Sequence, residues 1–128
     1  MKTRKHKTPR QRLIKDCDTL FSKIIRKRDP VCVYCHKNKT RHTHHLFSRR
    51  FLNTRWDFSN GWSLCGGCHL FLAHVDPIDF HDFAKKKIGE KEYNRLRAIS
   101  HMISKVDLSM IKLSLSKHWE MLEKLEEL

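Results

Sequence analysis

The sequence predicts an α+β fold in which a short cysteine-rich segment lies between helices. Apolar residues recur at the spacing of one helix face from Leu13 to Ile25, and Asp76-Pro77 and Gly89 fit the two ends of a later helix. Residues 31–76, between these helices, contain four of the five cysteines and only short apolar runs. The chain has 128 residues, of which 39% are apolar. That supply is enough for one compact core, so we expect a single domain.

The expected elements follow in order along the chain. Residues 1–12 are basic and lack large apolar side chains after Met1, which predicts a flexible arm. A helix over about 11–28 follows, and Asp29-Pro30 ends it. Helices are then expected over 77–88 and about 90–104, and Asp107 is expected to cap a last helix. Within that last segment, residues 111–116 also alternate as a strand would.

The charge balance predicts a polyanionic partner. The chain has 27 Lys and Arg against 14 Asp and Glu, a formal net charge of +13. No stretch approaches the ~18 apolar residues of a membrane span, and no apolar run follows the basic N-terminus, so we expect neither membrane insertion nor secretion. Residues 107–128 carry five acidic residues and three lysines. We expect this amphipathic segment to serve in packing or as the surface of a homodimer.

Two Cys-x-x-Cys pairs predict a structural zinc site. The pairs are Cys32 with Cys35 and Cys65 with Cys68. Each pair places two thiolates on a tight turn, and two such turns complete the four-sulfur shell that structural zinc prefers. A shell of three cysteines with His36 or His69 is the alternative. Free thiols of this kind imply a reducing compartment, so we expect a cytoplasmic protein. Cys17 lies on the apolar face of the first helix, where we expect a small buried side chain.

A pattern of histidines and one asparagine lies in the same segment. His44 and His45 are adjacent, Asn60 follows His45 by fifteen residues, and His69 follows Asn60 by nine, directly after the last cysteine. In the frame of two Cys-x-x-Cys turns, this pattern resembles the HNH endonucleases of the ββα-metal superfamily, in the subgroup with a four-cysteine zinc site. Small phage and mobile-element HNH nucleases are most similar, and the segment also resembles phage Holliday-junction resolvases of the endonuclease VII type.

The resemblance covers residues 31–76, about a third of the chain. It implies one nuclease domain over 13–128, in which 13–30 is a helix, 31–76 is the zinc-stapled ββα-metal core and 77–128 is a helical C-terminal extension. If a phage encodes the chain, the expected location is the cytoplasm of the host cell.

Phosphodiester hydrolysis at neutral pH needs a base for the attacking water and a cation for the developing charge. The resemblance implies that His45 is this base, and that Asn60 bonds across the connecting loop to hold it. A divalent ion held by His44 and His69 would stabilise the leaving 3′ oxygen, leaving 5′-phosphate ends on DNA. Many family members have aspartate at the position of His44. An imidazole at this position binds Mn²⁺, Ni²⁺ or Zn²⁺ better than Mg²⁺. We therefore expect activity with several divalent ions, among them Mg²⁺, Mn²⁺, Ni²⁺ and Zn²⁺.

Other histidines are weaker candidates. His74 follows His69 by five residues, which is about 140° around an α-helix, so the two share an ion only if the helix is distorted. His42 precedes His44 by two residues and lies on the same strand face if the strand is regular. We expect no metal role for the histidines outside this segment: His6, His81, His101 and His118.

Three arginines between His45 and Asn60 are expected to contact nucleic acid, because guanidinium groups match phosphate geometry. They are Arg49, Arg50 and Arg55, and Arg55 is a candidate for holding the scissile phosphate. The aromatic residues of this loop are expected to pack in its core. Two alternatives stay open: a zinc module that binds DNA without cutting it, and a nuclease directed at branched DNA or RNA.

Overall fold

A computed structural model describes residues 3–128 and has an α+β fold. Its sheet has two antiparallel strands, β1 (His42–His45) and β2 (Gly61–Leu64). The α-helices are α1 (Pro9–Arg28), α2 (Leu52–Arg55), α3 (Gly66–Cys68), α4 (Pro77–Ile88), α5 (Glu90–Ser100) and α6 (Leu108–Glu126). A 3₁₀ turn, η1 (Phe58–Asn60), precedes β2, and a π-helix, η2 (His69–His74), follows α3. Among the described residues, no helix has both the length and the apolar character needed to cross a bilayer.

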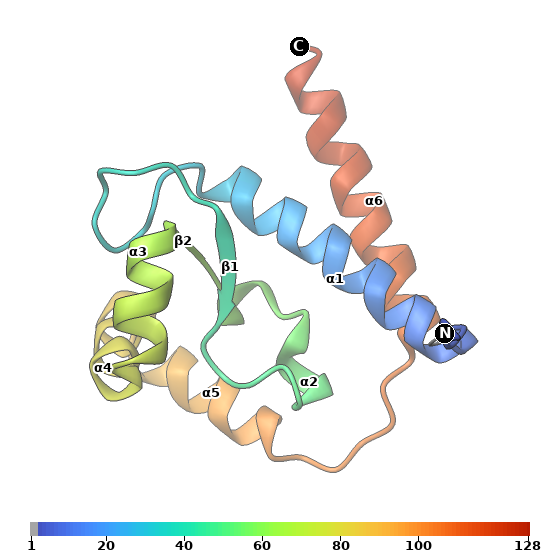
Figure 1. The fold of residues 1–128 in the computed structure, drawn as a ribbon, viewed down its shortest axis with the longest axis horizontal. Coiled ribbons are helices and arrows are strands. Elements are labelled where there is room, and N and C mark those ends of the chain that lie inside the picture. Colours follow the sequence, from blue (N-terminus) through green and yellow to red (C-terminus); the bar gives the residue numbers. More distant parts are fainter. Residues whose placement is uncertain (1–2) are drawn as a thin grey trace.

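Helices cover both faces of this small sheet. Helices α1 and α6 pack together on one side, and α3, η2 and α4 lie on the other (Figure 1). Strand β2 is buried throughout. Its Gly61 and Ser63 lie against α1, where the Ser63 hydroxyl donates to the Ile25 carbonyl at 3.1 Å. Trp62 and Leu64 point to the opposite side, because side chains alternate along a strand.

The apolar side chains therefore form two clusters, and the expectation of one compact core is wrong. The cluster on the side of α4 contains Cys32, Leu46, Phe47, Trp62, Leu64, Cys65, Phe80, Ala84 and Leu96. The cluster on the side of α1 contains Cys17, Phe21, Ile24, Ile25, Trp56, Leu108 and Leu115. A two-stranded sheet separates them because both of its faces are covered. Cys17 is fully buried between α1 and α6, as its position on the apolar face predicts.

Several helix ends differ from the sequence expectations. Helix α1 begins at Pro9, because Thr8 and Gln11 form a capping box, so residues 9–12 are helical and do not belong to an arm. Helix α5 ends at Ser100, before the expected end at residue 104. The helix over 77–88 and the cap at Asp107 are confirmed. The strand alternative over 111–116 is wrong, because that segment lies within α6.

Candidate metal centres and active site

Four cysteines form the first candidate metal centre. Their sulfur atoms all lie within 4.8 Å of one another, and the residues are Cys32, Cys35, Cys65 and Cys68. The Cys35 and Cys65 sulfurs are 3.9 Å apart. Sulfurs about 2.3 Å from one tetrahedral zinc ion lie about 3.8 Å apart, so this separation fits zinc. The four cysteines are thus positioned to hold a structural metal ion. The alternative shell with His36 or His69 is not the one that the fold assembles.

Backbone geometry prepares these sulfurs for a cation. The first turn is closed by a hydrogen bond from the Cys32 N–H to the Asn38 carbonyl at 2.9 Å, and His36 adopts a φ of 57° within it. Hydrogen bonds from the N–H groups of Lys37 and Asn38 lower the pKa of Cys35 to about 6. A bond from the Cys68 N–H likewise lowers the pKa of Cys65. Thiolates are the form that binds metal, so the turns favour the ligand state of Cys35 and Cys65, whereas burial raises the pKa of Cys68.

The second cysteine turn leads directly into a π-helix. Cys65 caps α3, and η2 begins at His69, the residue after Cys68. A π-helix closes bonds between residues five apart, so His74 lies over His69. The two Nε2 atoms are 3.0 Å apart. The helix is therefore distorted in the way that would let His69 and His74 share one ion.

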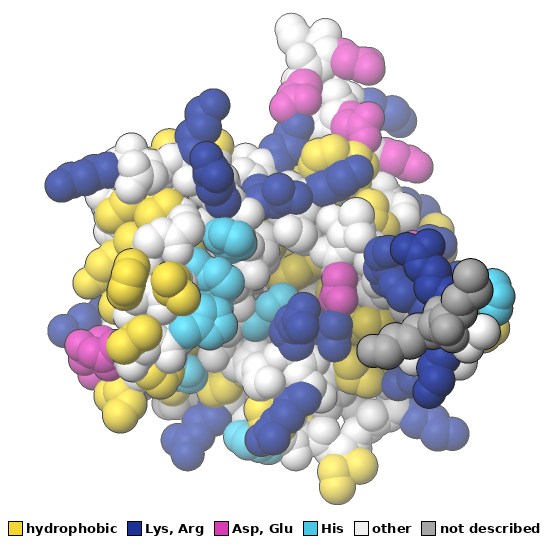
Figure 2. Space-filling view, in the orientation of Figure 1, with side chains coloured by type: hydrophobic (Ala, Val, Ile, Leu, Met, Phe, Trp, Pro, Cys, Tyr) yellow, Lys and Arg dark blue, Asp and Glu magenta, His cyan; other side chains and the backbone are white. Residues whose placement is uncertain are grey.

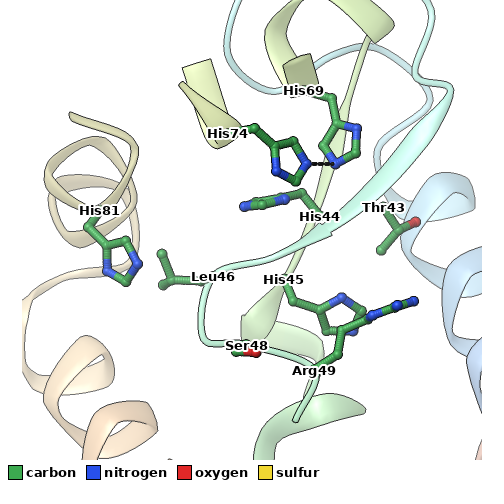
Figure 3. A pocket seen from close by; sticks show the side chains of 9 residues that line it. All are labelled: Thr43, His44, His45, Leu46, Ser48, Arg49, His69, His74 and His81. Carbon is green, nitrogen blue, oxygen red and sulfur yellow. Dashed lines mark hydrogen bonds between the residues drawn. The ribbon is translucent and has the colours of Figure 1, made fainter. Parts of the chain in front are cut away.

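Three histidines form the second candidate metal centre. One ring nitrogen from each of His44, His69 and His74 lies within 4.8 Å of the other two, and the rings point toward one another in Figure 3. Imidazole nitrogens about 2.1 Å from one ion lie about 3.0–3.4 Å apart at angles of 90–109°, which fits the His69–His74 separation. His42 stacks on His69 with ring centroids 4.8 Å apart and does not join this group.

Burial favours the neutral form of two histidines in this cluster, His44 and His69. Burial, together with the neighbouring imidazoles, lowers the pKa of His44 to about 3. Burial also lowers the pKa of His69. A neutral imidazole carries a nitrogen lone pair, which is the form that coordinates metal.

His45 lies on the opposite face of β1 from His44. In the strand pairing it faces Gly61, and its ring stacks on Phe21 with centroids 5.5 Å apart. Its Nε2 lies 2.9 Å from the Arg55 carbonyl. A carbonyl only accepts hydrogen bonds, so Nε2 carries the proton and Nδ1 carries the lone pair. Burial lowers the pKa of His45 to about 4, so this neutral tautomer persists at pH 7.

Asn60 bonds across the connecting loop, as the resemblance implies. It is fully buried. Its Oδ1 accepts from the Phe47 N–H at 2.7 Å, and its Nδ2 donates to the carbonyls of Phe47 and Thr54 at 3.1 and 2.9 Å. Thr54 precedes Arg55, whose carbonyl accepts from His45. Asn60 thereby fixes the backbone that orients the His45 ring.

Arg55 does not have the free guanidinium that a phosphate contact requires. Its Nε and Nη2 donate to the two carboxylate oxygens of Asp18 at 2.9 and 2.6 Å, and its Nη1 donates to the Arg49 carbonyl. Asp18 also accepts from the Trp56 indole at 2.9 Å. Asp18 thus ties the segment that carries the His45 acceptor to α1. We expected Arg55 to hold the scissile phosphate, but its guanidinium instead pairs with Asp18 and has a positioning role. The spacing of residues in the sequence does not predict this contact.

One cleft of about 640 Å³ contains both sets of histidines. It is lined by Thr43, His44, His45, Leu46, Ser48, Arg49, His69, His74 and His81 (Figure 3). The Arg49 side chain lies beside the His45 ring, whereas Arg50 is exposed over Phe51. His81 enters from α4 and is fixed by the Tyr93 hydroxyl at 2.9 Å. His81 lies outside the histidine and asparagine pattern, and only the packing of α4 brings it to the cleft.

Comparison with models of protein families, with curated proteins and with solved structures finds no match to this chain. The cleft combines His45, whose Nδ1 carries the lone pair, with a cluster of three histidines and the Arg49 side chain.

Proposed function

We propose that this chain is a divalent-metal-dependent endonuclease of the HNH type that hydrolyses DNA phosphodiester bonds. The observation that carries the proposal is a single cleft in which His45, with Nδ1 as its basic atom, lies beside a cluster of three histidines. The spacing of His44, His45, Asn60 and His69 inside two Cys-x-x-Cys turns supports the same family. A base and a cation site in one open cleft are the parts that phosphodiester hydrolysis requires.

The donor set fits a borderline divalent ion. His44, His69 and His74 would hold it, and three imidazoles favour Mn²⁺, Ni²⁺ or Zn²⁺ more than Mg²⁺. Such an ion, when bound, polarises a phosphate oxygen and offsets charge on the leaving 3′ oxygen. The four cysteines would hold a separate structural zinc ion, whose closed thiolate shell leaves no position for substrate.

The chain's own residues supply the proton transfer and the substrate contacts. His45 Nδ1 accepts the proton of the attacking water, and the Arg55 carbonyl holds the ring in the tautomer that allows this. Arg49 is the cleft residue whose guanidinium is suited to a phosphate oxygen. Asn60 and Asp18 are positioning residues, since they act through the backbone around Arg55.

DNA is the proposed substrate because basic side chains near the histidines can bind its negatively charged phosphates. Figure 2 shows a stripe of histidine side chains with Lys and Arg side chains gathered beside it. Exposed basic residues that could contact neighbouring phosphates are Lys37, Lys39, Arg41 and Arg50. If about six phosphates are neutralised, log K for duplex DNA should fall with log salt at a slope of roughly −5.

Cleavage of supercoiled plasmid tests the proposal. Metal-depleted protein reconstituted with one zinc equivalent is incubated with plasmid and with Mg²⁺, Mn²⁺, Ni²⁺ or Zn²⁺ in turn. We expect open-circle or linear product with wild type and with the exposed control His6→Ala. Loss of the general base in His45→Ala should lower the rate by about 10²–10⁴-fold.

The same assay distinguishes the alternatives. Tight plasmid binding without cleavage of intact, nicked or branched DNA by any ion would contradict the proposal and favour a DNA-binding zinc module. Faster cleavage of RNA than of DNA would support the proposed phosphodiester hydrolysis but would show that the substrate is RNA.

A further inference from the structure

Helix α6 has two apolar faces, and only one of them is covered. The covered face packs on α1 through Leu108, Ile111, Leu115, Trp119 and Leu122. The other face consists of Met110, Leu113, Met121 and Leu125, with Leu128 just after the helix. Each of these five side chains is at least 49% exposed. At about 100° per residue they lie within about 60° of the direction of Met110, so they form one stripe, which Lys117 and Lys124 interrupt.

The stripe follows a helix whose C-terminal end stands out from the fold. In Figure 1 this end of α6 rises above α1 and the sheet, although Glu126 still reaches Lys27 on α1. Acidic side chains gather on this projecting part, while Lys and Arg dominate the rest of the visible face (Figure 2). Residues 107–128 carry a net charge of −2, and residues 1–106 carry the remaining +15. The stripe therefore lies on an acidic segment, where the basic bodies of two copies repel each other less.

Along the helix, the positions of the stripe are symmetric about the level of Trp119, whose own side chain lies on the covered face. Positions equally far from Trp119 are Met110 and Leu128, Leu113 and Leu125, and Lys117 and Met121. A two-fold dimer requires such a pattern, because residue i of one copy must fit residue j of the other and the reverse must also hold. An antiparallel pair of α6 helices centred on Trp119 satisfies this at each of these positions. The aliphatic stem of Lys117 covers Met121 in that arrangement.

Charge supports the same register. Lys117 lies on the stripe and Glu120 lies at its edge, about 60° away around the helix. In the antiparallel pair, Lys117 of one copy lies beside Glu120 of the second copy, and symmetry repeats this contact. Charged pairs at the edge of an apolar helix seam select partner and orientation. The antiparallel direction also places the two positive bodies toward opposite ends of a helix pair about 28 Å long.

We propose that the exposed stripe of α6 binds the same stripe of a second copy, forming an antiparallel two-fold dimer centred on Trp119. The dimer carries two copies of the histidine-lined cleft on one particle. A single hydrolytic site cuts one strand, so the pair also accounts for cleavage of both strands; this consequence alone rests on the proposed function.

Molecular mass in solution tests the dimer without any activity. Light scattering after gel filtration, and sedimentation velocity from about 1 to 100 μM, should give twice the chain mass for wild type. Leu113→Lys and Leu125→Glu each remove an apolar contact twice per dimer, so each should raise the dissociation constant at least about a hundredfold. Both side chains are exposed, so circular dichroism should show unchanged helix content.

The double variant tests the register. In the proposed pairing Leu113 of one copy lies level with Leu125 of the second copy, across the seam between the helices. The substitutions Leu113→Lys and Leu125→Glu made together therefore place opposite charges across this seam, and L113K/L125E should recover the dimer that each single variant loses. The matched control is Ile78→Glu on α4, which is 74% exposed and should leave the dimer intact. A monomer at every wild-type concentration would overturn the proposal. So would a double variant as monomeric as the single ones, or a dimer lost in Ile78→Glu and kept in the α6 variants.

Discussion

Replacing Asn60 tests how the loop after β1 is held. Asn60→Ala removes three hydrogen bonds, to the Phe47 N–H, the Phe47 carbonyl and the Thr54 carbonyl. All three lie at a fully buried side chain, so water does not replace them. Asn60→Asp keeps the shape of the side chain and the oxygen that accepts from the Phe47 N–H. It replaces the donating Nδ2 with a second oxygen, which faces the carbonyls of Phe47 and Thr54.

The expected cost follows from these contacts. Each lost bond costs about 1 kcal/mol, and unpaired buried partners and the space left by the amide raise the total to about 3–5 kcal/mol. For a chain of this length, that loss corresponds to a fall in Tm of about 10–20 °C. Asn60→Asp should lose a similar amount, because an unpaired buried carboxylate replaces the two donors.

Urea denaturation and thermal unfolding measure these changes. The matched control is Asn94→Ala, since Asn94 is exposed on α5 and its change should stay within about 0.5 kcal/mol. An Asn60→Ala protein less than about 1 kcal/mol below wild type would refute the reasoning, because the bonds would then not hold the loop.

Four further outcomes are expected. Gly61→Ala should lower the free energy of unfolding in urea by about 1–3 kcal/mol, because a Cβ there would lie 2.7 Å from Phe21 Cζ. In the control Gly66→Ala, the new Cβ meets no atom within 4 Å, so the free energy of unfolding should be nearly unchanged. Asp18→Ala should cost about 2 kcal/mol by leaving Arg55 and the Trp56 indole without their acceptor, whereas Asp16→Ala breaks an exposed pair with Lys112 and should cost under about 0.5 kcal/mol. Chelation should expose four thiols to a colorimetric thiol reagent in the folded chain, while Cys17, whose pKa burial raises to about 11, should react only after unfolding; five fast thiols would contradict this. Because burial lowers the pKa of folded His45 to about 4, below the unfolded value of about 6.5, the unfolded state binds more protons between these values. Stability should therefore fall by about 1–2 kcal/mol more in wild type than in His45→Gln between pH 7 and pH 5, and equal losses would contradict the burial argument.

Local patterns predicted the parts of the fold that local interactions determine. The helix over 77–88 follows from a cap and a proline at one end and a glycine at the other. The four cysteines are brought together because each pair already shares a turn. Asn60 has the loop-bridging contacts that the resemblance implies, although its catalytic importance stays a prediction.

Long-range packing determines what the sequence did not predict. The π-helix that joins His74 to His69 depends on how η2 is held between the cysteine turn and α4, and an ideal α-helix would separate these residues. Arg55 was expected to be free because its partner, Asp18, lies 37 residues away on α1. His81 reaches the cleft only because α4 packs against the sheet through Phe80. Spacing within a short motif contains no information on these contacts.

We propose that one chain holds a structural ion at its cysteines and a second, catalytic ion at its histidines. Elemental analysis of metal bound per chain, with plasmid cleavage measured on the same samples, tests it most directly. The account predicts two ions in wild type, with cleavage only when the second is present, and one ion without cleavage in a His69→Ala/His74→Ala variant. A wild-type chain that holds one ion at saturation, or a variant that loses the second ion and still cuts DNA, would contradict it.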